Sequence, residues 1–361
     1  MSHAANPPAP GAIPATMTAM RCGRGGGPEV LAPGTVAVPR PGPGEVLLRV
    51  HAASVNFLDV WLRRGALTLP LPHTPGCDGA GVAVAVGPGV SGVTPGGAYL
   101  IHPGLSCGVC SACAGGQGQL CPQFAILGAA PRVAGTYAEF VLLPGRNLLP
   151  LPEGLDMAAA ATLGVAGVTA WHLLVTRARL RPGDTVLVPG AGGGVGTFAV
   201  QIARLWGARV LATAGGAEKC QKVLKLGAEA CFDHSRGAVA PWVREQTGGW
   251  GADVVLNHTG AERFADDLAA LAVGGRLLVC GTTTGATAQL PLRDLFSRQQ
   301  SVLGARLGGI SDLHALLARV AAGAICPVID RTFPLRQAGE AHAWLESRGH
   351  FGKVVLDVRN G

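Results

Sequence analysis

The chain has 361 residues, of which 48% are hydrophobic and 14% are charged, which is enough apolar sequence for two domains of ordinary size. This composition excludes a disordered protein. The 29 basic and 22 acidic residues leave a net charge of +7, but the basic residues are scattered along the chain, so no nucleic-acid partner is expected.

The first part of the chain is predicted to be a flexible tail followed by a β-rich domain. Residues 1–16 are rich in Ala and Pro and lack the basic and apolar regions of a signal peptide. Short strands are predicted at 46–50 and 81–86, with Pro and Gly turns between the apolar runs. This pattern indicates a compact, barrel-like β domain.

Four of the ten cysteines lie in one short stretch with the spacing C-x2-C-x2-C-x7-C: Cys107, Cys110, Cys113 and Cys121. Two tight CxxC turns and a fourth thiolate favour a closed tetrahedral Zn²⁺ site, with a four-thiolate iron–sulfur cluster as the alternative. Four thiolates leave no open position on the metal, so the site is predicted to be structural. Disulfides are not expected, because the protein is expected to be cytoplasmic, where thiols stay reduced.

Another strand is predicted at 136–143, and a helix at 157–176 that leads into the second domain. The stretch from Met157 to Val175 contains no Asp, Glu, Lys or Arg and is long enough for a membrane span. It consists mostly of Ala, Gly and Thr, so a buried helix is favoured and no membrane partner is expected.

The sequence TVLVPGAGGGVG at 185–196 has the form of a strand, a glycine-rich turn and the start of a helix. The helix carries an apolar stripe, and a second strand follows from Arg209. Glycines let backbone N–H groups approach a pyrophosphate closely, and a helix N-terminus favours the anion. The flanking strand and helix therefore favour dinucleotide binding over an ordinary glycine turn.

Strands and helices alternate through the second domain, which predicts a doubly wound parallel sheet of the α/β class. Strands are predicted at 185–188, 209–213, 230–232, 253–257 and 276–280. Helices are predicted at 195–206, 217–226, 238–247 and 262–272. A later helix at 311–322 precedes a terminal strand at 353–358, which is expected to return to the first domain.

No acidic residue follows the second strand of this domain, where an NAD-binding protein usually holds the ribose 2′-OH. Lys219 on the next helix is a candidate contact for a 2′-phosphate, with a surface lysine as the alternative. NADPH is therefore predicted in preference to NADH. Further cofactor contacts are expected where two parallel strands end, at His258, Thr259, Gly260, Gly281 and Thr282.

Together these features resemble the medium-chain dehydrogenase/reductase superfamily over residues 17–361. The specific marks are the sequence GCDGAG at 76–81, the cysteine stretch, the GAGGGVG turn and GKVVL at 352–356. The resemblance implies a GroES-like β-barrel catalytic domain over 17–165 with a zinc lobe at about 104–124, a Rossmann domain over 166–308, and a return to the catalytic domain over 309–361. An active-site cleft is expected between the domains, and a homodimer or homotetramer that acts on a small-molecule substrate.

The resemblance also implies where the cofactor binds. The residues so assigned are Thr169, Gly190, Gly193, Gly194, Val195, Gly196, Thr213, Lys219, His258, Thr259, Gly260, Gly281, Thr282 and Lys353.

Departures from the family pattern change the expected chemistry. Zinc alcohol dehydrogenases of this family bind a catalytic Zn²⁺ through a Cys, a His and a second Cys, and by motif position these fall on Asn56, Cys77 and Val165. A catalytic zinc takes three protein ligands, and of these three residues only Cys77 is able to coordinate. The chain is therefore expected to have kept the structural zinc and lost the catalytic one, and Asn at the first position is also found in zinc-free quinone oxidoreductases.

The candidate catalytic residues are Asn56, Asp59, Cys77 and Asp78, and each has a plainer alternative. Asn56 either hydrogen-bonds a substrate carbonyl or the nicotinamide ribose, or satisfies a turn. Asp59 is expected to fix its loop, and Asp78 either faces the cleft or braces a turn. Cys77 is either a small buried residue, or a ligand or reactive thiol.

The predicted activity is NADPH-dependent reduction of quinones or conjugated enones by direct hydride transfer, with the protein orienting the cofactor and excluding water. Asn56 and backbone N–H groups are the expected donors to the developing oxyanion. Two alternatives stay open: an alcohol dehydrogenase with zinc held by an unusual set such as Cys77 and Asp78, and an NADPH-binding protein without turnover. His172 and His342 show no ligand spacing and are assigned to the core or surface.

Overall fold

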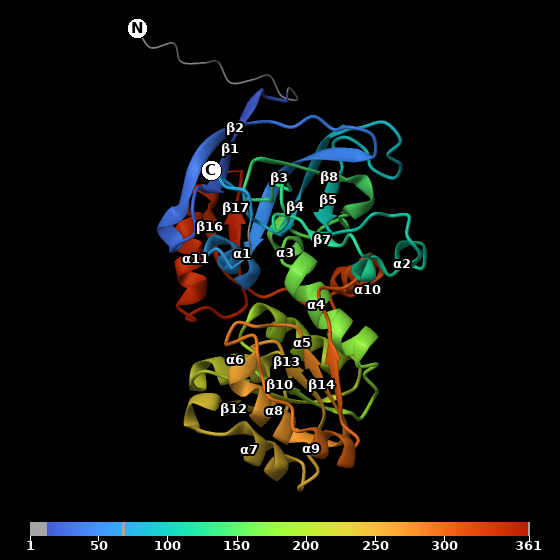
Figure 1. Cartoon of the computed structure of the whole chain (residues 1–361), viewed down its shortest axis with the longest axis vertical. Coiled ribbons are helices and arrows are strands. Elements are labelled where there is room, and N and C mark those ends of the chain that lie inside the picture. The colour runs from blue at the N-terminus through green and yellow to red at the C-terminus, as the bar shows by residue number, and fades with distance from the viewer. Residues whose placement is uncertain (1–12, 67–68, 360–361) are drawn as a thin grey trace.

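The computed structural model describes residues 13–66 and 69–359. Most of the predicted N-terminal tail lies outside these residues, and Thr16 already begins the first strand. The described chain forms two lobes (Figure 1). The β-rich lobe contains both ends of the chain, and the α/β lobe is formed by its middle.

The α/β lobe is built on a six-stranded parallel sheet, which confirms the predicted fold class. Its strands are β10 (Thr185–Val188), β11 (Arg209–Ala214), β12 (Ala230–Asp233), β13 (Ala252–Asn257), β14 (Leu271–Val279) and β15 (Ser301–Gly304). They lie in the order β12-β11-β10-β13-β14-β15, so the strand order reverses between β10 and β13. Ligands of doubly wound sheets bind at the carboxyl ends of the strands at this reversal.

Helices cover both faces of the parallel sheet. They are α5 (Gly194–Leu205), α6 (Ala217–Lys225), α7 (Val239–Gln246), α8 (Phe264–Ala270) and α9 (Leu292–Ser297). Successive side chains of a strand point to opposite faces, so a strand buried on both sides needs an unbroken apolar run. In β10, Val186 and Val188 pack in the same cluster as α5, whereas Leu187 packs with α7 and α8.

The β-rich lobe contains a second, mostly antiparallel sheet, with a hairpin of β1 (Thr16–Cys22) and β2 (Leu31–Ala37) beside it. The sheet consists of β3 (Glu45–Val55), β4 (Asp78–Val86), β5 (Ala98–Ile101), β8 (Phe140–Pro144), β9 (Leu148–Pro150), β16 (Ile329–Pro334) and β17 (Lys353–Asp357). The long strand β3 pairs with β4, β8 and β17, and α1 (Phe57–Arg63) follows it directly.

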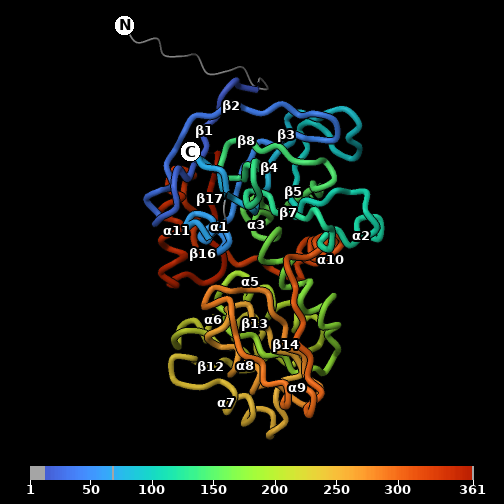
Figure 2. Tube along the Cα trace, in the orientation of Figure 1, coloured from blue at the N-terminus to red at the C-terminus, as the bar shows by residue number. Residues whose placement is uncertain are grey.

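The last part of the chain lies in the β-rich lobe (Figure 2). β17 runs antiparallel to β3, with Val354 opposite Val55. Earlier in the chain, α10 (Ile310–Ala321) packs beside α4 (Val168–Trp171), and its Leu313 and Leu316 share a core cluster with the α/β lobe. The helix α11 (Ala338–Glu346) lies between β16 and β17 in the chain.

A helical segment from Met157 to Arg177 joins the two lobes, and it includes two stretches of π-helix. It is long and apolar enough to cross a membrane by length and composition. However, 78% of its most apolar window is buried inside the structure, as in the core helix of a soluble protein.

One predicted strand is shorter than expected. The strand at 136–143 begins only at Phe140. The backbone N–H groups of Thr136 and Tyr137 donate to the carbonyls of Gly76 and Pro75, so this part of the chain binds the loop before β4 instead of extending β8. This contact places Tyr137 beside the candidate site described below.

Candidate active site

The glycine-rich turn lies at the carboxyl end of β10 and begins α5. Gly190 has a φ of +62°, a conformation that favours glycine, and its N–H donates to Thr213 Oγ1 over 3.2 Å. Gly193 is the N-cap of α5, and Gly194 is its first residue. A Cβ on Gly196 would lie 2.6 Å from the Cα of Ala191, so the turn tolerates no side chain there. The turn therefore presents backbone N–H groups and a helix N-terminus toward the space between the lobes, which suits a pyrophosphate.

Residues after β13 and β14 meet this turn at the reversal of strand order. His258 donates from Nε2 to the carbonyl of Pro189 over 2.7 Å, and burial lowers its pKa, so the ring is neutral. Thr259 has a buried hydroxyl with no hydrogen-bond partner among the described residues, and its methyl group lies near Gly190. A Cβ on Gly281 would lie 2.2 Å from the carbonyl oxygen of His258. An orphaned hydroxyl beside the glycine turn fits a site completed by a cofactor.

The other predicted cofactor residues lie along the same edge. Val195 is half-buried in the first turn of α5, and Thr169 is buried on α4. Gly260 has a φ of +114°, and Thr282 is exposed after β14.

The loop between α11 and β17 crosses from the β-rich lobe to the glycine turn. The N–H of Gly352 donates to the carbonyl of Gly192 over 2.8 Å, and Lys219 Nζ donates to the carbonyl of Arg348 over 2.6 Å. Burial, followed by the charges of Arg263, Arg348 and Lys219, lowers the pKa of His234. These cations therefore surround one region of the cofactor edge. Of these three cations, only Lys219 was predicted from the sequence; Arg348 lies 129 positions further along the chain.

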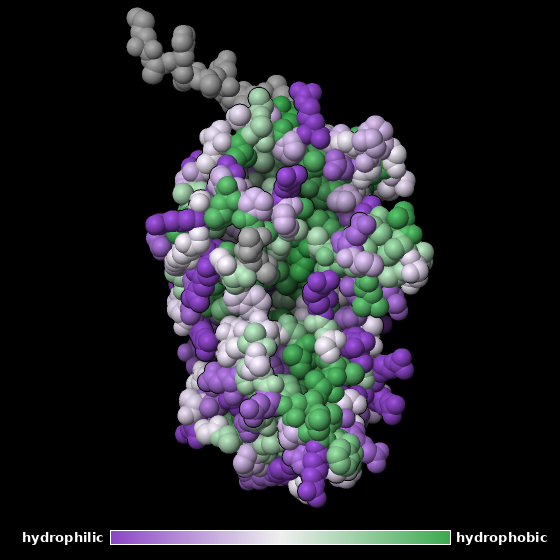
Figure 3. Space-filling view, in the orientation of Figure 1, coloured by the Kyte–Doolittle hydropathy of each residue, from purple (hydrophilic) through white to green (hydrophobic). Residues whose placement is uncertain are grey.

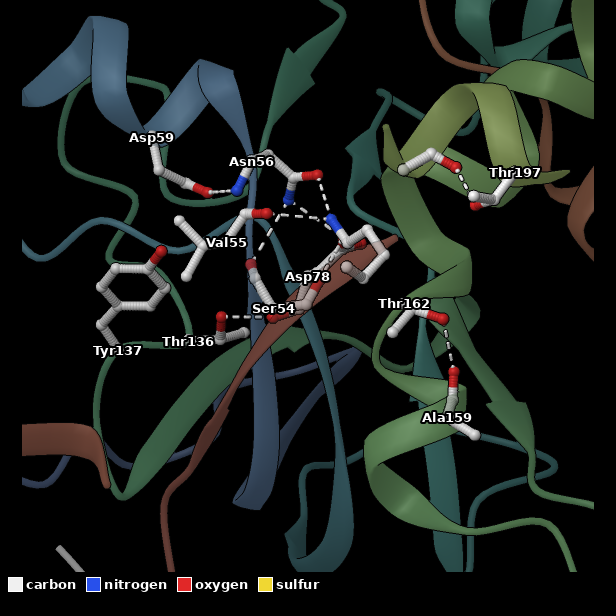
Figure 4. A network of polar contacts seen from close by, with 12 residues as sticks. Ser54, Val55, Asn56, Asp59, Asp78, Thr136, Tyr137, Ala159, Thr162 and Thr197 are labelled. Carbon is white, nitrogen blue, oxygen red and sulfur yellow. Dashed lines mark hydrogen bonds and ion pairs between the residues drawn. The ribbon is translucent and has the colours of Figure 1, made fainter. Parts of the chain in front are cut away.

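The candidate catalytic residues meet where β3 ends and β4 and β17 begin (Figure 4). Asn56 donates from Nδ2 to Asp78 Oδ2 over 3.0 Å and to the carbonyl of Ser54 over 3.3 Å. Ser54 also donates its hydroxyl to Asp78 Oδ2 over 2.8 Å. Lys353 donates from Nζ to Asn56 Oδ1 over 2.6 Å and to the carbonyl of Val55 over 3.0 Å, and it lies 3.5 Å from Asp78 Oδ2.

These contacts use the hydrogen-bond donors of Asn56 that were expected to face the substrate. Both amide hydrogens of Asn56 are directed at protein oxygens, so neither is free for a substrate oxyanion in this arrangement. The Lys353 side chain is 4% exposed and that of Asp78 is fully buried. Burial lowers the pKa of Lys353 and raises that of Asp78, and each charge partly offsets the shift of the other. The result is a buried ion pair bridged by a neutral amide.

Asp59 and Cys77 lie on the other side of Asn56. Asp59 caps α1: its Oδ2 accepts the backbone N–H of Asn56 over 2.8 Å. Burial raises the pKa of Asp59 to about 6. Burial and the neighbouring charge of Asp59 raise the pKa of Cys77 well above its usual value, which keeps a protonated thiol at neutral pH. Both residues thus lie against the loop that holds Asn56.

Val165, at the third position of the expected metal set, is half-buried and offers no ligand atom. Within the described part of the chain, one group of His, Cys, Asp or Glu side chains is close enough to share an ion, and it is the four cysteines. Their ligand atoms all lie within 4.8 Å of one another. The Sγ atoms of Cys110 and Cys113 are 3.5 Å apart and those of Cys107 and Cys113 are 3.9 Å apart.

A tetrahedral Zn²⁺ with Zn–S bonds of about 2.3 Å requires sulfur atoms about 3.8 Å apart, so the cysteine cluster fits this ion. Backbone N–H groups of Val109 and Cys110 lower the pKa of Cys107 to about 6, whereas sharing a proton with the neighbouring thiols raises the pKa of Cys110 to about 11. The four thiolates would hold the metal and leave no position for a substrate.

Replacing Cys113 with Ser is expected to reduce the zinc content and lower the melting temperature, because the loop around 107–121 loses one of its four ligands. The rate of hydride transfer should change much less. Elemental analysis and thermal unfolding measure these effects, with the exposed Cys326→Ser as the control. Iron in place of zinc, or two tightly held zinc ions per chain, would contradict a single closed zinc site.

Both lobes match known families. Residues 42–153 match the alcohol dehydrogenase GroES-like domain, and residues 194–322 match the zinc-binding dehydrogenase family. The chain is 34% identical to the quinone oxidoreductase of Rattus norvegicus over 350 residues, which cover 94% of this chain and 97% of that protein.

Solved structures give the same result. A structure of an NAD-dependent alcohol dehydrogenase superposes with a TM-score of 0.90 at 46% identity, covering 95% of this chain and 100% of that one. A crotonyl-CoA carboxylase/reductase in complex with NADP superposes with a TM-score of 0.90 at 26% identity, covering 99% and 98% of the two chains. The chain therefore belongs to the medium-chain dehydrogenase/reductase superfamily. It is an oxidoreductase of this NAD(P)-dependent family.

Proposed function

We propose that the chain reduces quinones or conjugated enones with NADPH by direct hydride transfer, without a metal at the reacting centre. The observation that carries this proposal is the position of Lys353. Its ammonium group lies between Asn56 Oδ1, the carbonyl of Val55 and the carboxylate of Asp78, and Asn56 occupies the first position of the family's catalytic metal site. The identity to quinone oxidoreductases supports the same substrate class.

Lys353 also reaches the cofactor cradle. A Cβ on Gly194 would lie 2.6 Å from its Cδ, so the lysine stem packs against the first residue of α5. The reduced nicotinamide supplies the hydride when it is bound, and negative charge then develops on the substrate oxygen. The three N–H groups of Lys353 already point at protein oxygens, so its ammonium group acts on such charge through space and stabilises it less than a metal ion does. Quinones and enones fit this weaker electrophile, because they delocalise the charge.

A second candidate is alcohol dehydrogenation, which the 46% identity to an NAD-dependent alcohol dehydrogenase favours. With a metal at this centre, the reaction would require the Cys77 thiolate and a displaced Lys353. The buried contacts of Lys353 with Asn56 and Val55 oppose the second requirement. A third candidate, NADPH binding without turnover, predicts no oxidation of any acceptor.

Steady-state oxidation of NADPH across a panel of quinones, enones and aldehydes, with ethanol-like alcohols tested in the reverse direction, separates these candidates. Reduction of quinones or enones at rates well above those of aldehydes supports the proposal. Robust alcohol oxidation supports the second candidate, and tight NADPH binding with no turnover supports the third.

We also propose that NADPH is preferred over NADH. Lys219, Arg348 and Arg263 lower the pKa of His234, against one nearby carboxylate, Asp233, which raises it, and β11 ends without an acidic residue. This region therefore has an excess of positive charge that suits a 2′-phosphate. The Lys219 ammonium group is within reach of such a phosphate by exchanging the carbonyl of Arg348 for it.

A Lys219→Ala variant is expected to bind NADPH about tenfold more weakly and NADH almost unchanged, because it loses one charge-assisted contact to the phosphate. Fluorescence titration of each reduced cofactor measures the two affinities. Lys225→Ala, an exposed lysine on the same helix, is the matched control. Equal losses for both cofactors in Lys219→Ala would contradict the assignment of Lys219.

Finally, we propose that the chain forms a homodimer or homotetramer. Large apolar side chains are exposed on α9 and β15, namely Leu292 (67%), Phe296 (72%) and Val302 (36%), and an apolar area is visible on this lobe in Figure 3. β15 is also an edge strand of its sheet. Light scattering after size-exclusion chromatography measures the mass, and a monomer at micromolar concentration would contradict this proposal.

A further inference from the structure

A chain of buried polar groups leads away from Asp59 on the side opposite to Lys353. The hydroxyl of Tyr137 points toward Asp59 in Figure 4, and Asp59 is among the groups that raise the pKa of Tyr137 after burial itself. Tyr137 Oη lies 3.0 Å from His342 Nε2, and His342 Nδ1 lies 3.4 Å from the Arg63 guanidinium group. Arg63 in turn binds both carboxylate oxygens of Glu346, at 2.9 and 2.8 Å.

The chemistry of these four side chains determines which group donates and which accepts in each hydrogen bond between them. An arginine side chain only donates, so Arg63 donates to Nδ1 of His342. The ring of His342 is neutral, because burial and the charge of Arg63 lower its pKa to about 3. Its single proton must therefore be on Nε2, which donates to Tyr137 Oη. The one hydrogen of the Tyr137 hydroxyl is then left for another acceptor.

The carboxylate of Asp59 lies in the direction of this hydroxyl (Figure 4). Its Oδ2 accepts from the backbone N–H of Asn56, whereas its buried Oδ1 has no hydrogen-bond partner among the described residues. The donors near the carboxylate are the thiol of Cys77 and the hydroxyl of Tyr137. The hydroxyl of Tyr137 is a stronger donor than the thiol of Cys77. Its orientation is determined by the hydrogen bond that Tyr137 Oη accepts from His342.

We propose that Tyr137 and His342 are positioning residues of the reaction centre, which direct one hydroxyl hydrogen at Asp59 and so hold this carboxylate in place under Asn56. This inference rests on the proposed function, because it assigns these residues to the same site. Asp59 holds the backbone of Asn56, the side chain of Asn56 holds Lys353, and the charge of Asp59 favours the ammonium form of Lys353. A contact to the far side of Asp59 therefore acts on the lysine.

Other ionisable groups also affect the pKa of Asp59. Asp78 raises its pKa, whereas Lys353 and the bond from Cys77 lower it, in addition to the dominant effect of burial. Cys22 is also within electrostatic range of Asp59, on the side of Arg63. None of these groups is altered when the hydroxyl of Tyr137 is removed, so a change in the titration of Asp59 reports on that hydroxyl.

The first test is the tautomer of His342 in the wild-type enzyme, by ¹⁵N NMR of labelled histidine, with His342→Gln to assign its signals. We expect a neutral ring protonated on Nε2 from pH 5 to pH 9. A ring protonated on Nδ1, or an imidazolium, would overturn the proposed direction of the hydrogen bonds from Arg63 through His342 to Tyr137. This test requires neither a cofactor nor a substrate.

The second test removes the hydroxyl. The chain contains two tyrosines, so Tyr99→Phe is a matched control for Tyr137→Phe: Tyr99 is also buried, but its hydroxyl accepts from the N–H of Thr94. Losing a donor destabilises a carboxylate, so the pKa of Asp59 is expected to rise by about one unit in Tyr137→Phe, as measured by ¹³C NMR of labelled aspartate. Tyr99→Phe should leave this pKa unchanged.

The pH dependence of kcat is expected to shift together with the pKa of Asp59. In Tyr137→Phe the acidic limb of the kcat–pH profile is expected to move to higher pH by about one unit, so the loss relative to wild type is greatest at low pH. A pH-independent loss of kcat, or an unchanged pKa of Asp59, would assign Tyr137 to core packing and overturn the proposal. If the enzyme reduces no quinone while both NMR results are as expected, the proposed function fails and the hydrogen-bond chain stands.

Discussion

Replacing Lys353 with Met is expected to lower kcat for quinone reduction by about a hundredfold or more, because the reacting centre loses its buried cation. It should also lower the free energy of unfolding by about 3 to 5 kcal/mol, since Asp78 is left buried without its counter-charge. Steady-state kinetics and urea unfolding measure the two effects. Wild-type kcat in this variant would contradict the role given to Lys353.

The double variant Lys353→Met with Asp78→Asn separates stability from catalysis. It removes both charges, so much of the lost stability should return while kcat stays low. The sign of the pH dependence is also defined. Burial raises the pKa of Asp78, and removing Lys353 raises it further, so the folded single variant prefers a protonated Asp78. Its stability deficit should therefore be small at low pH and grow as the pH rises through this pKa.

Replacing Asn56 with Ala is expected to lower kcat by roughly tenfold to a few hundredfold and to leave NADPH affinity nearly unchanged. The structure gives this loss a different cause from a missing oxyanion donor. Asn56 provides the shortest contact of Lys353 and also separates it from Asp78, so the alanine variant should let the ion pair collapse. Single-turnover kinetics at saturating NADPH isolate this step.

Asn147→Ala is the matched control for Asn56→Ala. Asn147 is a buried amide in the same lobe that donates to the carbonyls of His102 and Gly104, away from the reacting centre. Its loss should lower stability and spare kcat. Normal quinone turnover in Asn56→Ala would return Asn56 to the role of a residue that only satisfies the end of β3.

The sequence predicts five of the six strands of the α/β lobe, because most of them carry an apolar run bounded by glycine, but it misses α9 and the edge strand β15, whose residues are largely exposed. The hydrophobic period is a local property, so strands such as β10 and β11 can be located without tertiary information. The end of β8 nearest the site could not be located, because Thr136 and Tyr137 bind the loop at 75–76 instead of a neighbouring strand. This preference arises from contacts between distant parts of the chain.

In the candidate site too, local sequence predicts some residues, whereas others depend on contacts between distant parts of the chain. Asn56, Cys77 and Asp78 were found from motif positions, and Ser54 was within reach, since alternation along β3 places it on the same side as Asn56. The ammonium group of Lys353 between Asn56 and Asp78 depends on the register that sets Val354 opposite Val55. Nearly three hundred residues separate these partners in the sequence. The contacts of Arg63 with His342 depend on packing between α1 and the last part of the chain in the same way.

The central claim, hydride transfer without a metal at the reacting centre, is tested most directly in a single turnover. Enzyme-bound NADPH is mixed with a quinone in a stopped-flow instrument after brief treatment with a strong chelator, and the zinc content per chain is measured on the same sample. We predict one zinc per chain and an unchanged rate of NADPH oxidation, since the closed cysteine site takes no part in the transfer. A rate that falls in step with the loss of a second zinc, together with chelator-sensitive oxidation of ethanol-like alcohols, would contradict the account.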